Sequence, residues 1–334
     1  MDPSTPLLGR SAQQADGPET REARQRGKHV QHHGEGGSPG AERWRPIVPA
    51  FVGVYKVLAL VHRANQATHE FVQQITHSAQ RVFGGICSEG LTLEEKTRLT
   101  IRIYDSYPDY FSVGNELYAW EEPWFARRLP APPASVLVGA CGTGREALAL
   151  AVRGYRVDAL EPAPEFVDES RRRLAARGHV YKLAYEELSA VVLDGKDSLE
   201  ATPRGTRYDA VILGSGSMTH VLDPRQQERL LRSMCRLCPQ GPILASFFCE
   251  PEEAPVCAGR ATRLGRSMGR ALARFRSMPP AHSDRLSYRA HSGFAYTFTP
   301  REIEQLASAI GRPLAWENDD NKLRPFHYAT FLAP

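Results

Sequence analysis

The chain has 334 residues, 42% of them hydrophobic and 24% charged, which is enough apolar material for one large domain or two smaller ones. A net charge of +4 is far from the concentrated positive charge of a dedicated nucleic-acid-binding protein. Six scattered cysteines lack the density of a secreted disulfide scaffold, and no charged start followed by an apolar segment marks a secretory signal. We therefore expect a globular cytoplasmic protein with no nucleic-acid or membrane partner.

The first 46 residues predict a disordered tail. They are rich in Gly, Gln, Ser, Pro, Arg and Glu and nearly lack large aliphatic side chains after Leu8. Such a segment cannot bury enough apolar surface to offset the entropy lost on ordering. His29, His32 and His33 lie in this tail, where we interpret them as part of a solvated polar tract. We expect no metal site.

Residues 47–125 predict a helical cap followed by a segment rich in aromatic residues from Tyr104 to Trp124, which we call the entry segment. Apolar residues at helical spacing form one stripe from Phe51 to Val61 and a second at Phe71, Ile75 and Val82. A third helix begins near Leu91. The stretch from Ile47 to Val61 is short for a membrane span and is interrupted by a lysine, so we interpret it as a packed helix.

The most informative stretch runs from Val136 to Glu161. An apolar run ends in a turn containing Gly142 and Gly144, where the backbone can come close to a ligand because no Cβ stands in the way. A helix of alternating Ala and Leu follows and stops at Gly154. A second apolar strand ends at Glu161, whose carboxylate can accept hydrogen bonds from the two hydroxyls of a ribose. The pattern predicts a nucleoside site.

Strands and helices continue to alternate after Glu161, which predicts a mainly parallel sheet covered by helices on both faces. Pro164, the pair Asp223-Pro224 and the box Thr299-Pro300-Arg301-Glu302 mark helix starts. Besides 136–138 and 157–161, the expected strands are 180–183, 208–213, 242–248, about 293–298 and 327–332.

The string Val136-Leu137-Val138-Gly139-Ala140-Cys141-Gly142-Thr143-Gly144 resembles the first motif of class I S-adenosylmethionine-dependent methyltransferases, usually written Val-Leu-Asp-Leu-Gly-Cys-Gly-Thr-Gly. The resemblance extends from about Tyr104 to the C-terminus. It implies a Rossmann-like α/β fold with a seven-stranded, mainly parallel sheet whose last strand is reversed. It also implies a cofactor-binding methyltransferase domain over 126–334 with a lid insertion over 250–290. Three positions depart from the family: Val138, Ala140 and Ala184 replace an acid, a glycine and a second acid.

The same resemblance implies S-adenosylmethionine as the cofactor and S-adenosylhomocysteine as the product. In such sheets the ligand lies at the carboxyl ends of the strands. The residues expected to bind the cofactor are Tyr104, Tyr110, Gly139, Ala140, Cys141, Gly142, Gly144, Glu161, Pro162, Tyr185, Glu186, Gly214 and Ser215.

Five residues are candidates for a catalytic base, which a methyl transfer to an OH or NH group needs for removing the proton. His220 comes first, because it follows the fourth strand by a few residues and imidazole titrates near neutral pH. His291 and Tyr296, before and in the expected sixth strand, come next, together with Tyr104 and Tyr110. Each of these residues can also be a lining or packing residue.

The acceptor is expected to be a small molecule methylated on oxygen, nitrogen or carbon. The fourth strand ends in Leu-Gly-Ser-Gly-Ser and lacks both the Asn/Asp-Pro-Pro-Tyr and the Pro-Cys motifs of nucleic-acid base methylation. Between residues 255 and 276, four arginines share one helical face and four apolar residues share another. This helix is either a solvated basic face over an apolar one or a wall that binds an anionic acceptor. These residues are Arg263, Arg266, Arg270 and Arg274 on the first face and Leu264, Met268, Leu272 and Phe275 on the second.

Other functions stay open on the sequence alone. Gly142 to Ala147 also fits a loose dinucleotide fingerprint, so a nicotinamide-dependent oxidoreductase is one alternative, although no Tyr-x-x-x-Lys follows the fourth or fifth strand. The three departures from the family make an inactive binding or scaffold protein another. Four dispersed cysteines keep arsenic methylation as a remote option: Cys141, Cys235, Cys249 and Cys257. Cys235 and Cys238 have CxxC spacing without a second pair, which does not favour zinc.

Overall fold

The structure is a computed structural model of the chain, and it describes residues 47–106, 114–196, 203, 207–250, 259–278, 285–289, 292–317 and 326–334. The chain divides into two compact units, Met1–Thr76 and His77–Pro334. The predicted disordered tail, Tyr110 and His291 lie outside the described residues. Within the described part, no helix combines the length and the apolar character that crossing a membrane requires.

The N-terminal cap contains one long helix where the sequence predicted two. α1 (Ile47–Gly90) is continuous over 44 residues. The prediction of two helices was wrong because residues 62–70, which join the two apolar stripes, contain no Gly or Pro to end a helix. Phe71 and Ile75 of the second stripe are 63% and 54% exposed, so this stripe is not buried. The cap continues with α2 (Leu93–Ser106) and α3 (Glu121–Arg128).

Five parallel strands form the main body of the sheet, in the order β3-β2-β1-β4-β5. The last strand, β9 (His327–Phe331), runs antiparallel to β5 and also pairs with β8 (Leu314–Trp316). The predicted α/β fold with a mainly parallel sheet and a reversed last strand is confirmed. The five strands are β1 (Ser135–Val138), β2 (Arg156–Glu161), β3 (Gly178–Lys182), β4 (Ala210–Leu213) and β5 (Ile243–Cys249).

Among the described residues the sheet has nine strands rather than seven. β6 (Leu286–Arg289) and β7 (Gly293–Phe298) form a hairpin, and β7 pairs with only the last two residues of β5, Phe248 and Cys249. β9 pairs with the rest of β5, so β7 and β9 both lie along the same edge of that strand. The sequence did not reveal β6 or β8, because strands of four and three residues are too short to show a period.

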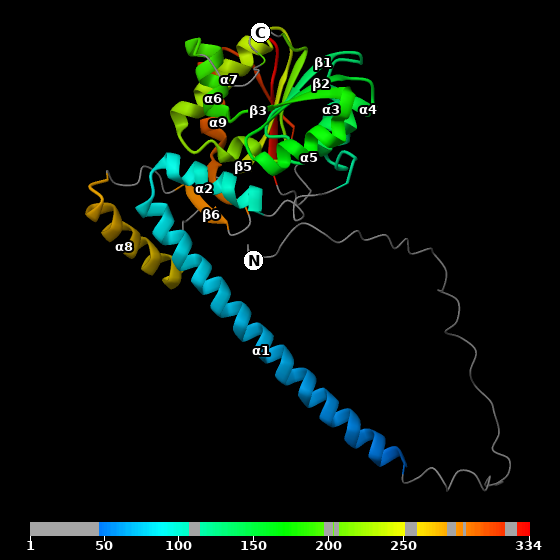
Figure 1. Cartoon of the computed structure of the whole chain (residues 1–334), viewed down its shortest axis with the longest axis vertical. Helices are drawn as coiled ribbons and strands as arrows, with labels where there is room; N and C mark the ends of the chain where they lie inside the picture. Colours follow the sequence, from blue (N-terminus) through cyan, green and yellow to red (C-terminus); the bar gives the residue numbers. More distant parts are fainter. Residues whose placement is uncertain are drawn as a thin grey trace, which may run out of the picture. The chain divides into compact units, whose positions relative to one another are not determined.

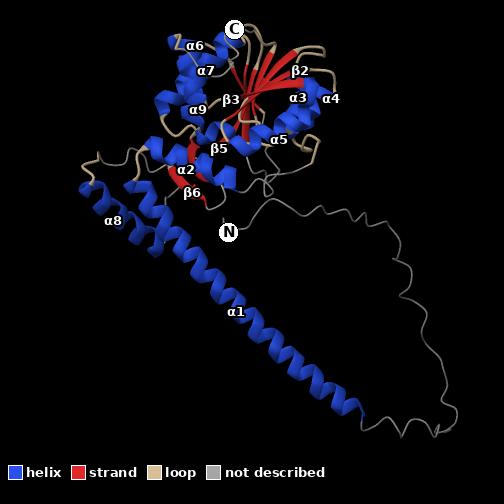
Figure 2. Ribbon diagram, viewed as in Figure 1, coloured by secondary structure: helices blue, strands red, loops and turns tan. Residues whose placement is uncertain are grey.

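Helices cover both faces of the sheet (Figures 1 and 2), with α3, α4 and α5 on one face and α6, α7 and α9 on the other. Two hydrophobic clusters form the core, and alternate residues of β1 pack into different ones. Leu137 packs in one cluster, and Val136 and Val138 pack in the other. The ranges are α4 (Arg145–Val152), α5 (Pro164–Leu174), α6 (Tyr185–Asp194), α7 (Pro224–Leu237), α8 (Arg260–Phe275) and α9 (Pro300–Ala309).

α2 is tied to both the hairpin and α5. The Phe294 backbone N–H donates a hydrogen bond to the Thr100 hydroxyl at 2.9 Å, and the Glu165 N–H donates to Asp105 Oδ1 at 2.9 Å. These contacts hold the C-terminal end of α2, which carries Tyr104, near the carboxyl ends of the central strands. The helix thereby covers the edge of the sheet where a ligand is expected.

Candidate functional site

The turn between β1 and α4 has the backbone that close approach to a ligand needs. Ala140, Gly142 and Gly144 have φ values of 47°, 56° and 85°. The left-handed conformation at Ala140 costs about 1 kcal/mol in a residue with a Cβ. A Cβ at Gly144 would lie 3.0 Å from the Ser170 Cβ, whereas one at Gly142 would meet nothing nearer than 3.9 Å. Gly144 is therefore needed for packing, and Gly142 leaves open space over the turn.

Glu161, at the end of β2, faces this turn. Its Oε2 accepts a hydrogen bond from the Gly142 N–H at 2.8 Å, and its Oε1 accepts one from the Ala163 N–H at 2.9 Å. Burial raises the pKa of Glu161 to about 7, against the effect of these two hydrogen bonds, which lower it. Each carboxylate oxygen has a second lone pair, so the group can also accept from two hydroxyls. Pro162, which follows, is half-buried.

Tyr185 fills the space behind the turn. Its hydroxyl donates to Ser217 Oγ at 2.9 Å, and a Cβ at Gly139 would lie 2.6 Å from the hydroxyl oxygen. The small residue at 139 therefore makes room for the phenol. Glu186 follows it at the start of α6, half-buried, and burial raises its pKa. The roles predicted for Tyr185 and Glu186 beside the cofactor stay predictions.

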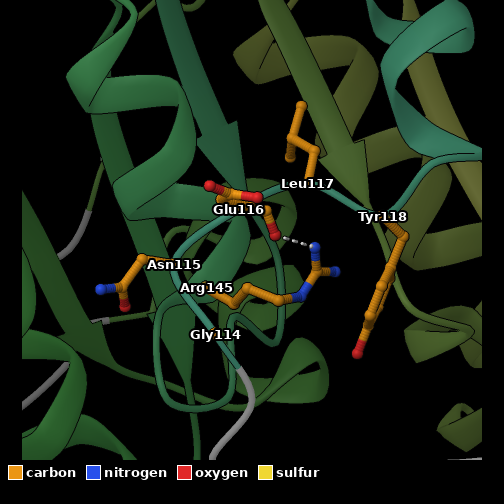
Figure 3. Close-up of a pocket in the computed structure, with 6 residues that line it drawn as sticks. All are labelled: Gly114, Asn115, Glu116, Leu117, Tyr118 and Arg145. Atoms are coloured by element: carbon orange, nitrogen blue, oxygen red, sulfur yellow. Dashed lines mark hydrogen bonds between the residues drawn. The ribbon is translucent and has the colours of Figure 1, made fainter. Parts of the chain in front are cut away.

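A buried ion pair anchors the start of α4. Arg145 Nη1 and Nη2 donate to the two carboxylate oxygens of Glu121 at 2.6 and 2.7 Å, and both side chains are at most 7% exposed. The guanidinium also lies 3.8 Å from the centre of the Tyr118 ring and donates to the Glu116 carbonyl oxygen at 3.0 Å (Figure 3). These groups join the glycine turn to the entry segment. They border a pocket lined by Gly114, Asn115, Glu116, Leu117, Tyr118 and Arg145.

Glu146 and Ser215 extend this cluster to the end of β4. Arg145 Nη2 donates to Ser215 Oγ at 3.2 Å and lies 3.5 Å from Glu146 Oε1, which makes no hydrogen bond. The Glu146 carboxyl packs directly against Gly214, where a Cβ would overlap it. Burial and the neighbouring Glu121 raise the pKa of Glu146 well above its usual range. The sequence analysis selected Gly214 and Ser215 but missed the charged members of this cluster, although two charged residues opening an Ala- and Leu-rich helix were a visible signal.

Replacing Arg145 by Met is expected to lower the free energy of unfolding by about 3–5 kcal/mol, because Glu121 then stays buried without its partner. Chemical denaturation of the two proteins measures the difference. Replacing Arg153 by Met is the matched control: its pair with Glu122 is 39% and 48% exposed and should contribute about 0–1 kcal/mol. Equal losses in the two variants would contradict the importance of the buried pair.

His220 lies in the short helix η3 (Ser217–His220) that follows β4, and both of its ring nitrogens have partners. Nδ1 lies 2.9 Å from the Phe294 carbonyl oxygen, and Nε2 lies 2.9 Å from the Tyr104 hydroxyl. A carbonyl can only accept, so Nδ1 carries the proton and Nε2 accepts from Tyr104. The pKa of His220 is lowered, chiefly by burial. The ring is therefore neutral and able to take up a proton. We call Tyr104 and His220 the Tyr–His dyad.

A cation lies close to the dyad. The guanidinium of Arg289, at the end of β6, stacks on the Phe248 ring at 3.8 Å from its centre. Within the described residues Arg289 has no ion pair. Its positive charge adds to burial in lowering the pKa of His220. The sequence analysis did not select Arg289, because the strand that carries it was not apparent.

The remaining catalytic and cysteine candidates have other surroundings. Tyr296 donates its hydroxyl to Glu302 Oε1 at 2.7 Å, within the capping box of α9. Its catalytic role stays a prediction.

Burial raises the pKa of the Cys141, Cys238 and Cys249 thiols, which disfavours the thiolate that binds soft metals. Within the described ranges, no three His, Cys, Asp or Glu side chains gather as a metal site.

Comparison with known proteins gives one domain match. Residues 136–241 match the sequence profile of a family described as "Methyltransferase domain". A search of curated proteins found no match. The chain is similar to the solved structure of an S-adenosylmethionine-dependent methyltransferase from Methanosarcina mazei, at 15% identity and a TM-score of 0.41, over 66% of this chain and 100% of that chain. It is also similar to the structure of an amino pentose methyltransferase from Micromonospora echinaspora, at 18% identity and a TM-score of 0.40, over 66% of this chain and 100% of that chain. Sequence identities and TM-scores this low say nothing about an acceptor for this chain.

Proposed function

We propose that the protein transfers a methyl group from S-adenosylmethionine to an oxygen, nitrogen or carbon atom of a small molecule, because residues 136–241 match a family described as a methyltransferase domain. The Tyr–His dyad carries the proposal, since it offers a proton acceptor at the carboxyl ends of the strands, beside the turn that would hold the cofactor. The match confirms the predicted methyltransferase family over residues 136–241.

The residues of the turn fit S-adenosylmethionine despite the departures from the family motif. Ala140 keeps the left-handed backbone that the usual glycine would give. Gly142 leaves the space above the turn open, and the Glu161 oxygens can accept from the ribose hydroxyls. Val138 is fully buried in the core and provides no polar group. The carboxyl of Glu146, beside Gly214, is the nearby acid that can take the place of the missing one.

The dyad supports a base-assisted displacement. When bound, S-adenosylmethionine would supply an electrophilic methyl group on a sulfonium, with a neutral thioether as the leaving group. Tyr104 would take up the proton of the nucleophile on its hydroxyl oxygen while donating its own proton to His220 Nε2. Burial raises the pKa of Tyr104, so the phenol relays a proton rather than standing ionised. The protein's other task is to align the nucleophile and exclude water.

Arg289 supports an acceptor that carries an anionic group. Its guanidinium lies over the Phe248 ring and brings a positive charge near the Tyr–His dyad. A guanidinium in this position can bind a carboxylate or phosphate in two hydrogen bonds and so orient the reacting atom. We therefore assign the proposed anion-binding role to Arg289 and not to α8, where the sequence suggested it.

The test is an acceptor screen. The purified chain is incubated with S-adenosylmethionine and a set of small hydroxyl- and amine-bearing molecules in matched anionic and neutral forms, and S-adenosylhomocysteine is measured by mass spectrometry. Catalytic release with an anionic member supports the proposal in full. Binding of S-adenosylmethionine without release from any member would favour a scaffold protein, and binding of nicotinamide cofactors in its place would favour an oxidoreductase.

The affinity for S-adenosylhomocysteine is expected to rise as the pH rises through about 7. Ribose hydroxyls donate to the ionised carboxylate, and burial raises the pKa of Glu161 to about 7 in the free protein. Binding should therefore release a proton near this pH, which calorimetry in buffers of different ionisation enthalpy detects. Glu161→Gln should bind more weakly and lose the pH dependence. The same dependence in that variant would contradict the assignment.

Protonation of Glu161 also makes the stability of the folded chain depend on pH. Its pKa of about 7 in the folded protein exceeds the ordinary value of 4.5, so the folded chain holds a proton that the unfolded chain releases. The free energy of unfolding of the ligand-free protein should then fall as the pH rises from about 4.5 to 7. Chemical denaturation at several pH values should show this decline reduced in Glu161→Gln.

A further inference from the structure

α8 uses a face of small residues to pack on the C-terminal turns of α1 (Figure 1). Gly265, Gly269 and Ala273 are spaced by four residues and are all buried. A Cβ at Gly265 would overlap the Val82 carbonyl, and one at Gly269 would lie 2.6 Å from the Ile86 carbonyl oxygen. The two backbones are therefore in close contact.

Because the small residues make this contact, the large apolar residues of α8 remain at the surface. Leu264, Met268, Leu272 and Phe275 are 57%, 50%, 38% and 88% exposed. One interpretation of the sequence was a solvated basic face over an apolar one. The structure leaves this apolar face exposed, because the periodicity could not show which face packs. Exposed apolar residues grouped along one helix are typical of an interaction surface.

The remaining face of α8 is basic. The helix contains five arginines and no acidic residue. Arg266 and Arg270 lie 3.9 and 3.6 Å from Glu89 of α1. Arg263 and Arg274 are exposed and form no ion pair with any described residue. The apolar stripe is thus flanked by positive charge that the fold leaves largely unbalanced.

We propose that α8 docks on an anionic lipid surface. In this arrangement Leu264, Met268 and Phe275 enter the boundary between headgroups and acyl chains, while the arginines contact lipid phosphates. An amphipathic helix with a basic polar face lies in the membrane interface without spanning it. A second copy of the chain is a poorer occupant, because it would bring the same positive charges against these arginines. The inference differs from the sequence prediction of no membrane partner and is independent of the proposed reaction.

The experiment is co-sedimentation of the full chain with vesicles of phosphatidylcholine, with and without phosphatidylglycerol as about one quarter of the lipid. Binding is expected only to the anionic vesicles and should be lost in about 1 M salt, where the screening length is about 3 Å. The variant Leu264→Ser/Met268→Ser/Phe275→Ser should bind at least tenfold more weakly. Val152→Ser is the matched control, since Val152 is also apolar and 70% exposed but lies on α4.

A second variant, Arg263→Gln/Arg274→Gln, separates the charge from the apolar contact. It should weaken binding to anionic vesicles and reduce its salt dependence. Circular dichroism and thermal unfolding verify that the variants fold. Absence of binding by the parent chain, or an equal loss in the Val152→Ser control, would overturn the proposal. So would a concentration-dependent dimer that only the triple variant abolishes, since that would make a second copy the occupant.

Discussion

Replacing Gly142 by Asp is expected to abolish S-adenosylhomocysteine binding while the chain stays folded. A Cβ at this position has open space around it, and Asp tolerates the left-handed φ of 56° better than most residues. The new carboxylate would occupy the space over the turn and lie close to Glu161. We expect at least a thousandfold loss of affinity, about 4 kcal/mol, measured by calorimetry.

Gly195→Asp is the matched control for this substitution. Gly195 ends α6 with a φ of 68°, and a Cβ added there would meet nothing within 4 Å. Asp at this position therefore introduces the same backbone strain away from the turn. The control should bind S-adenosylhomocysteine as the parent does. Retained binding in Gly142→Asp would place the cofactor elsewhere, and unfolding of both variants would show that left-handed strain alone decides the result.

The second large effect is expected on the rate. Tyr104→Phe and His220→Ala should each lower turnover by about 10²–10⁴-fold, the usual contribution of a positioned proton acceptor. Because the two residues act as one unit, the double variant should be little slower than the slower single variant. Steady-state release of S-adenosylhomocysteine with an acceptor from the screen measures this. The affinity for S-adenosylhomocysteine should stay within about twofold of the parent in the His220 variant.

Two further observations test the dyad. The acidic limb of the pH profile of kcat/KM should lie below pH 6.5, the ordinary value for a histidine, because burial lowers the pKa of His220. The limb should vanish in His220→Ala. Tyr296→Phe is the control, since that hydroxyl bonds to Glu302, and its rate should change by less than about threefold. Unchanged turnover in both dyad variants would mean that alignment of the nucleophile alone suffices.

The central part of the fold was predictable because its signals are local. The apolar run of β1, the two glycines of the turn, the Ala- and Leu-rich α4 and the acid ending β2 lie within 26 residues, from Val136 to Glu161. Their order alone specifies a strand, a turn, a helix and a parallel strand. The capping box at Thr299 is equally local and forms as its sequence predicts.

The parts that escaped prediction depend on long-range contacts. His220 meets Tyr104 across 116 positions and Phe294 across 74, so no spacing rule brings them together. Arg145 and Glu121 form their buried pair through packing of the entry segment on α4. For α8 the periodicity gave the arginine face and the apolar face, but it did not identify the glycine face, whose packing depends on how closely α1 approaches.

The hydrogen bond between the Phe294 carbonyl and His220 has a consequence for how this site can change over evolutionary time. The group that fixes the histidine tautomer belongs to the main chain of β7, which every amino acid supplies alike. Substitution at position 294 can therefore alter the packing around the histidine without removing the bond that orients it. Only an insertion, a deletion or a shift in the hairpin register would do so. Variation in acceptor choice could thus accumulate in the hairpin side chains while the proton-accepting nitrogen stays in place.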